Sequence, residues 1–108
     1  MGCAMTSPTQ RTLDHLRAAG YPLVQVVERW NPRAKVRQDL FGIVDVLAVN
    51  EAGIVAVQTT SASNVAARIT KITDSPALPI LRKAGIRVLV HGWAKRKGRW
   101  TLREVELS

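Results

Sequence analysis

The feature that most constrains this chain is a pair of apolar runs, residues 39–49 and 54–60, separated by a short turn. Runs of this length, rich in Val and Ile and joined by a few turn residues, are typical of an antiparallel β-hairpin. Each run nevertheless carries polar residues where a buried strand disfavours them: Asp45 in the first run, and Gln58 and Thr60 in the second. The chain must therefore build a sheet and also stabilise a carboxylate within it.

Alternation of side chains along a strand predicts which residues of the hairpin share a face. The sets are Asp39, Phe41, Ile43 and Asp45 in the first run, and Ile54, Ala56, Gln58 and Thr60 in the second. Pairing around the turn brings Asp45 close to Gln58. Asp39 is either a further acid near this site or a turn residue. Gly42 indicates a bulge or a close approach by another backbone, and a bulge would reverse the parity between the two aspartates.

Two arrangements would compensate the charge of Asp45. A hard divalent ion such as Mg²⁺ takes oxygen ligands, and the candidates are Asp45, the Gln58 carboxamide, the Thr59 backbone carbonyl and Glu28 on the preceding strand. Alternatively, Asp45 is a structural core residue that accepts hydrogen bonds from backbone amides or pairs with an arginine such as Arg37.

The remaining segments predict three helices and three further strands. Ser7 is a suitable N-cap for the first helix, and Gly20 and Gly85 supply helix stops. The expected helices are 7–19, 61–72 and 76–84, and the expected strands are 21–30, 86–93 and 99–107. With the hairpin, the element order is αβββααββ. This order predicts an α/β fold, a mixed central sheet with helices packed on it, in a single domain spanning residues 1–108.

The charge balance favours a polyanionic partner. Sixteen Lys and Arg face eight Asp and Glu, which gives a net charge of +8. Many of the cations lie in two predicted turns, as Arg33, Lys35 and Arg37, and as Lys95, Arg96, Lys97 and Arg99. Such clusters are typical of phosphate contacts with nucleic acid, although a solvated basic surface has the same composition. Trp30, Trp93 and Trp100 could stack on bases, but aromatic residues near strand ends more often pack in the core.

Several other classes of site and location are disfavoured. His15 and His91 lack the spacing of a zinc site, and His91 follows a buried strand as a structural histidine does. The single cysteine, Cys3, cannot form an internal disulfide. No apolar run approaches the ~20 residues that span a bilayer, and no signal peptide is visible. We therefore expect a cytoplasmic protein, bacterial or in a phage-infected host cell.

Two short motifs carry a family resemblance. "GIVDVLAV", with Asp45, is followed by "AVQTT", with Gln58, Thr59 and Thr60. Between helices, this pattern resembles the PD-(D/E)XK nuclease superfamily. It is most similar to the small Holliday-junction-resolvase-like and VRR-NUC-type members, many of them phage-encoded. In that superfamily an Asp on the second core strand and an (E/Q)xK triplet on the third bind Mg²⁺ and activate water. The resemblance spans residues 9–90 in element order and implies a restriction-endonuclease-like αβββαβ core.

The resemblance implies a Mg²⁺-dependent DNA endonuclease, with Mn²⁺ as a substitute metal. It further implies selectivity for branched DNA such as a Holliday junction, and a homodimer. On this chain the metal ligands would be Asp45, Gln58, Thr59 and Glu28. A cation from the second helix, Arg68 or Lys71, would assist catalysis, with Thr60 as a hydrogen-bonding positioner.

Three departures from the family pattern keep other functions open. Gln58 replaces the usual acid, and Thr60 replaces the lysine of the triplet. Thr9 or Gln10 stands where the first helix often carries a Glu, which leaves Glu28 as the extra carboxylate. The alternatives are a catalytically inactive nucleic-acid-binding module on the same fold and a basic RNA-binding domain without metal.

Overall fold

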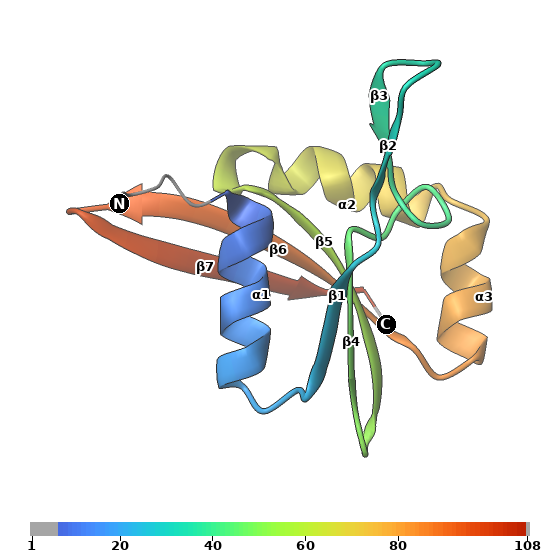
Figure 1. Cartoon of the computed structure of the whole chain (residues 1–108), viewed down its shortest axis with the longest axis horizontal. Coiled ribbons are helices and arrows are strands. Elements are labelled where there is room, and N and C mark those ends of the chain that lie inside the picture. The colour runs from blue at the N-terminus through green and yellow to red at the C-terminus, as the bar shows by residue number, and fades with distance from the viewer. Residues whose placement is uncertain (1–6, 108) are drawn as a thin grey trace.

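A five-stranded mixed sheet with helices on both faces organises the protein in the computed structural model, which describes residues 7–107 (Figure 1). Cys3 lies outside this range. The strands stand in the order β1-β4-β5-β6-β7, and only β5 and β6 pair in parallel. Their bounds are Leu23–Val26, Val46–Asn50, Gly53–Ser61, Arg87–Arg96 and Arg99–Glu106. The predicted α/β class with a mixed sheet is confirmed.

Helix α1 (Pro8–Ala18) covers one face of the sheet, as the sequence predicts. The Ser7 hydroxyl caps it by accepting a hydrogen bond from the Gln10 N–H at 3.1 Å. Gly20 follows its end with a φ of 98°, a backbone conformation that favours glycine. The buried face of α1 contributes Leu13 and Leu16 to a core cluster whose sheet residues are Val46, Ala48, Val55, Val57 and Leu89.

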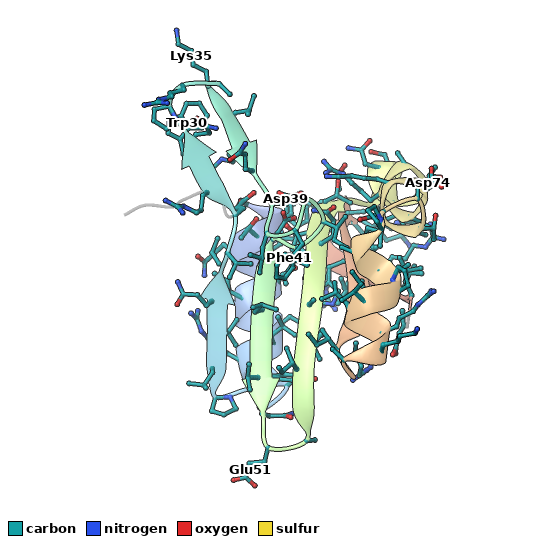
Figure 2. The ribbon with its side chains drawn as sticks, turned by 90° about the vertical axis from the view of Figure 1, so that its right-hand side faces the viewer. Trp30, Lys35, Asp39, Phe41, Glu51 and Asp74 are labelled. Carbon is teal, nitrogen blue, oxygen red and sulfur yellow. The ribbon has the colours of Figure 1, made fainter. Side chains whose placement is uncertain are left out.

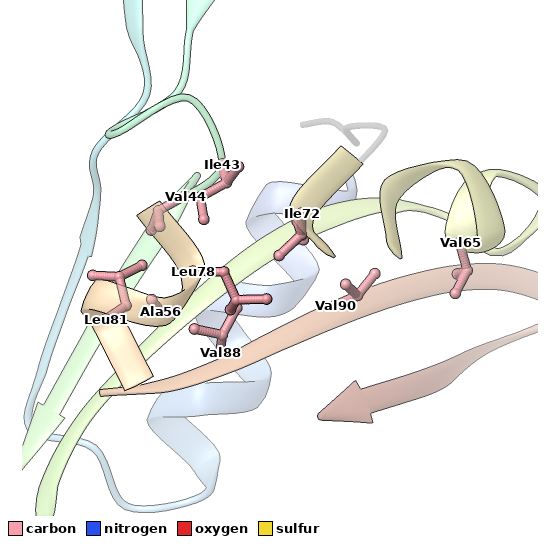
Figure 3. Packing of buried hydrophobic residues seen from close by; sticks show 9 residues of the cluster. All are labelled: Ile43, Val44, Ala56, Val65, Ile72, Leu78, Leu81, Val88 and Val90. Atoms are coloured by element: carbon pink, nitrogen blue, oxygen red, sulfur yellow. The ribbon is translucent and has the colours of Figure 1, made fainter. Parts of the chain in front are cut away.

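The opposite face is covered by the crossover between the two parallel strands. It comprises the 3-10 turn η1 (Ala62–Asn64), α2 (Val65–Thr73) and α3 (Ala77–Lys83). Both predicted helices are therefore present with shorter bounds. Their apolar side chains pack on β5 and β6 in a second core cluster, which Figure 3 shows: Ile43, Val44, Ala56, Val65, Ile72, Leu78, Leu81, Val88 and Val90.

One glycine allows this crossover to lie directly on the sheet. A Cβ added at Gly92 of β6 would stand 2.2 Å from Val65 Cγ2 and 3.2 Å from Ala62 Cα. Real side chains do not approach so closely, so the start of α2 sits on β6 only because position 92 has no side chain.

The predicted strand 21–30 is wrong in its second half. β1 ends at Val26, and β2 (Arg29–Asn31) pairs instead with β3 (Val36–Gln38) in a separate two-stranded ribbon. The ribbon projects beyond the body of the protein (Figures 1 and 2). The cause is local. Asn31 Oδ1 accepts hydrogen bonds from the backbone N–H groups of Arg33 and Ala34, at 3.0 and 3.2 Å, and these bonds stabilise the turn that reverses the chain.

The predicted strand 39–49 is also wrong in its first half. Residues 40–44 form a tight turn closed by a bridge between Leu40 and Val44, and β4 begins only at Val46. Phe41 and Gly42 have φ of 57° and 78°, which reverses the chain, so Gly42 marks a turn rather than the bulge or the close backbone approach that the sequence indicates. Asp39 and Asp45 therefore flank a turn rather than lie six residues apart along one strand.

The C-terminal hairpin agrees with the prediction. β6 and β7 pair out to Arg96 and Arg99, with the basic turn at Lys97 and Gly98 between them. β7 forms one edge of the sheet. Within residues 7–107, no helix has the length and apolar character needed to cross a membrane.

Candidate metal centre

Three carboxylates meet where the ribbon joins the body of the protein. Oxygen atoms of Glu28, Asp39 and Asp45 all lie within 4.8 Å of one another. Glu28 stands in the link between β1 and β2, and the two aspartates flank the turn before β4. The structure thus brings together the predicted Asp45 and Glu28. It adds Asp39, which is a turn residue whose side chain also faces the site.

Asp45 is the most buried of the three, at 4% exposure. Its Oδ2 accepts hydrogen bonds from Gln58 Nε2 at 2.8 Å and from the Thr59 N–H at 2.9 Å, with the Thr59 hydroxyl at 3.4 Å. Burial, together with the neighbouring Asp39 carboxyl, raises the pKa of Asp45 to about 7. The contacts of Thr59 with Asp45 run through its N–H and hydroxyl groups, whereas the prediction for metal binding named its carbonyl.

Gln58 lies beneath the carboxylates and is 1% exposed. Its Nε2 donates to both aspartates, at 2.8 Å to Asp45 Oδ2 and 3.1 Å to Asp39 Oδ2. Its Oε1 is buried with no hydrogen-bond partner among the described residues. In this orientation Gln58 acts as a donor rather than as the predicted oxygen ligand. A half-turn of the amide would exchange the two atoms and direct the unpaired oxygen toward the carboxylates.

One of the two cations predicted on the second helix reaches the carboxylates. Lys71 Nζ of α2 lies 3.1 Å from Asp39 Oδ2. Burial raises the pKa of Asp39, but hydrogen bonds with Asp45, Gln58 and Lys71 outweigh it and hold the pKa below its usual value. The other member of the predicted pair, Arg68, lines the same cleft.

An open cleft of about 310 Å³ gives solvent access to this centre. The predicted Thr60 is buried in β5 and does not line it. Thr9 of α1 does line it and lies 3.1 Å from the Thr59 hydroxyl, measured between the two Oγ1 atoms. Arg37 pairs with Glu28 at 3.5 Å rather than with Asp45. The lining residues are Thr9, Glu28, Arg37, Asp39, Asp45, Thr59, Arg68 and Lys71.

The two predicted basic clusters lie on two hairpins that leave the body in different directions (Figure 1). Arg33, Lys35 and Arg37 belong to the β2–β3 ribbon, and Lys95, Arg96, Lys97 and Arg99 to the end of the β6–β7 hairpin. Of these seven residues, Arg37 alone lines the acidic cleft.

The three tryptophans have different surroundings. Trp93 is buried and donates its Nε1–H to Thr12 Oγ1 at 2.9 Å. The ring of Trp100 stacks with the Arg11 guanidinium, whose carbon lies 3.3 Å from the ring centroid. Trp30 is 58% exposed on the ribbon. His91 is fully buried between Thr12 and Glu104, consistent with a structural histidine.

Comparisons with protein-family models, with curated proteins and with solved structures found no match to this chain. Sequence reasoning left open the role of Asp39 because the turn that directs it toward Asp45 depends on Phe41 adopting a left-handed conformation. The adjacent Gly42 was the only local signal of that turn.

Proposed function

We propose that the protein is a Mg²⁺-dependent DNA endonuclease that hydrolyses phosphodiester bonds at the Glu28–Asp39–Asp45 centre. The observation that carries the proposal is a cluster of three carboxylates in an open cleft beside Lys71, two of which accept hydrogen bonds from the buried Gln58. The element order supports it as well. α1, β1, β4, β5, α2 and β6 occur in the order of the αβββαβ core of the PD-(D/E)XK superfamily, with the β2–β3 ribbon between β1 and β4 and with α3 between α2 and β6. Asp45 immediately precedes the second of these strands, and Gln58 lies in the third.

The charges of the centre suit a divalent ion. Lys71 and Arg37 each contact one of the three carboxylates, which leaves one negative charge without a cationic partner within residues 7–107. The pKa of about 7 means that a proton on Asp45 balances this charge at mildly acidic pH. A hard cation with a preference for carboxylate oxygen would replace that proton. After a half-turn of its amide, Gln58 would direct its unpaired Oε1 toward the carboxylates as a further oxygen ligand.

The side chains around the centre have distinct tasks in phosphodiester hydrolysis. A Mg²⁺ held by Glu28, Asp39 and Asp45 would lower the pKa of a bound water and would stabilise negative charge on the scissile phosphate. Lys71 and Arg68 line the same cleft and stabilise the negative charge that develops in the transition state. Arg37, at the base of the ribbon, binds a neighbouring phosphate of the DNA and so fixes the position of the DNA strand relative to the centre.

The substrate preference that we propose is for branched DNA, including Holliday junctions. Symmetric cutting of a junction needs two centres, so the proposal includes a homodimer.

A second candidate is a DNA-binding module that lacks catalysis. It is favoured by the orientation of Gln58, whose amide nitrogen rather than oxygen faces the carboxylates. The replacement of the triplet lysine by the buried Thr60 favours it too. In this case Lys71 and Gln58 would complete a structural network, and the basic hairpins would account for binding.

A cleavage assay separates the two candidates. Wild type, Asp45→Asn and Glu51→Gln are incubated with labelled four-way junction, flap, single-stranded and linear duplex DNA, in Mg²⁺, Mn²⁺ or EDTA. Glu51 is the matched acidic control, since it is exposed at the β4–β5 turn, far from the centre (Figure 2). We expect metal-dependent cutting by wild type and Glu51→Gln that is lost in Asp45→Asn. DNA that is bound but uncut in every metal would favour the binding module.

A further inference from the structure

We propose that a second hollow, at the base of the ribbon, holds a single nucleobase that is unstacked from the DNA. This inference rests on the proposed action on DNA and names the substrate class. The ribbon hollow has a volume of about 410 Å³, and its lining includes Arg29, Trp30, Gln38, Asp39, Leu40 and Phe41. It is separate from the acidic cleft except at Asp39, which lines both.

Two exposed aromatic side chains line this hollow. Trp30 is 58% exposed and Phe41 is 62% exposed. Within the described part of the chain, neither side chain makes a hydrogen bond or ring contact, in contrast to Trp93 and Trp100. Aromatic faces held open to water on a projecting ribbon and turn suit stacking on bases, which every nucleobase permits. Figure 2 shows Trp30 on the projecting ribbon and Phe41 on the body, with Asp39 labelled where the ribbon joins the body.

The backbone at Phe41 is a second, independent indication. Its φ of 57° places a bulky residue in the left-handed region, at a cost of about 1–2 kcal/mol. Glycine or asparagine would make the same turn with less strain. Because the Phe41 side chain is mostly exposed, burial in the core does not repay that strain. Contact with a ligand does account for an aromatic residue at this position.

The polar groups of the hollow suit a nucleotide. Arg29 and Gln38 face each other as a cross-strand pair, and their side chains make no hydrogen bond to other described residues. An amide and a guanidinium can both bind the edges of a base. Residues 29–38 contain four cations, Arg29, Arg33, Lys35 and Arg37, and no acid. Arg29 lines the hollow and the other three cations stand on the same ribbon, so the positive charge of the ribbon favours a base carried on a polyanionic backbone.

The position of Asp39 links this hollow to the chemistry. Since Asp39 lines both spaces, a base in the ribbon hollow belongs to a nucleotide close to the phosphate in the acidic cleft. Unstacking a base from a continuous duplex costs a few kcal/mol, whereas a bulged or branch-point base is already available. The expected substrates are therefore DNAs with an unpaired base near the cut.

The test is a binding measurement in EDTA, which needs no cleavage. Fluorescence anisotropy compares a continuous duplex with the same duplex carrying one bulged 2-aminopurine. Wild type should bind the bulged DNA about tenfold more tightly and quench the 2-aminopurine by stacking. Trp30→Ala and Phe41→Gly should each remove the preference and the quenching. Trp30→Phe should keep both. As the matched control, Lys35→Ala at the tip of the ribbon should weaken binding of the two DNAs equally.

Equal binding of the two DNAs by wild type, or an unchanged preference in Trp30→Ala and Phe41→Gly, would overturn the inference. Thermal melting of the variants checks that the fold is intact. We expect it to be, because the side chains of Trp30 and Phe41 are both exposed. The outcome is distinct from that of the proposed function. A preference that depends on Trp30 without any cleavage supports the hollow and refutes the endonuclease, whereas cleavage with no such preference does the reverse.

Discussion

At the scale of single residues, the balance of charge around Asp45 decides what the site can hold. The sequence predicts that something must compensate this buried carboxylate, and the structure supplies two kinds of partner. The Thr59 N–H and the Gln58 amide donate to it, as in the structural alternative. Two further carboxylates also approach it, which a purely structural aspartate does not need. Asp45 is thus held in place by hydrogen-bond donors, while no cation among the described residues forms an ion pair with it.

The raised pKa of Asp45 makes stability depend on pH. An ordinary unfolded Asp titrates near ~3.9, while the folded group titrates at about 7. The folded state therefore binds the proton more tightly, and wild type loses stability as pH rises from 5 to 7. Asp45→Asn cannot lose a proton. The difference in free energy of unfolding, variant minus wild type, should therefore increase by roughly 2–3 kcal/mol from pH 5 to pH 8, because only wild type loses stability over this range. Urea unfolding in EDTA measures this, and a constant difference would contradict it.

Lys71 should control the ionisation of Asp39. Its ammonium group lies 3.1 Å from Asp39 Oδ2 and helps to lower the pKa of that carboxyl. In Lys71→Met the pKa of Asp39 should rise, which an NMR titration of the carboxyl carbons detects. Arg68→Met is the matched control, because Arg68 lines the cleft without an ion pair to Asp39. If the protein is a nuclease, Lys71→Met should also lower the cleavage rate by about 10². An Asp39 that titrates as in wild type would refute the assigned contact.

At the scale of elements, local signals predict the helices and the central hairpin well. The Ser7 cap and the Gly20 stop define α1, and the β4–β5 pairing places Asp45 beside Gln58 as expected. The ribbon and the 40–44 turn could not be predicted in the same way. Residues 21–30 and 39–49 have continuous strand patterns, but the chain leaves the sheet after Val26 and reverses at Phe41. Both departures are determined by tertiary structure, and the alternation of side chains along the sequence does not predict them.

The close approach at Gly92 makes a sharp prediction about packing. Gly92→Ala places a methyl group 2.2 Å from Val65 Cγ2, so α2 must shift away from β6. We expect a loss of about 2 kcal/mol in the free energy of unfolding, measured by urea denaturation. Val65→Ala removes the clashing methyl group. The double variant should therefore be more stable than the sum of the two single effects predicts. Simple additivity would show that the two sites do not touch.

At the scale of the whole molecule, positive charge surrounds a small acidic centre. The net charge of +8 includes the four cations of residues 29–38, and of these Arg37 lines the cleft that holds the three carboxylates. The ribbon is exposed along most of its length and contributes no residue to either core cluster. It is thus an addition to the folded body rather than part of its support.

Removing the ribbon should separate stability from binding. Residues 30–37 can be replaced by Asn-Gly, which closes a two-residue turn between Arg29 and Gln38. The melting temperature should stay within about 2–4 °C of wild type, because little buried surface is lost. DNA affinity should fall, and the slope of log K against log salt should become shallower by ~0.9 for each lost phosphate contact. An unchanged slope would exclude the ribbon from the DNA interface.

The position of the three carboxylates at the base of the basic ribbon has a thermodynamic consequence. In the proposed complex with DNA, a phosphate attracted by the ribbon would be repelled by the three carboxylates until a cation neutralises their charge. Metal and DNA would then bind cooperatively, each tightening the other by the same factor, as linkage requires. At low metal concentration, the metal-free protein would contact DNA through the ribbon alone. The centre would fill with metal chiefly once a phosphate is beside it, so that DNA itself would act as the switch for metal loading.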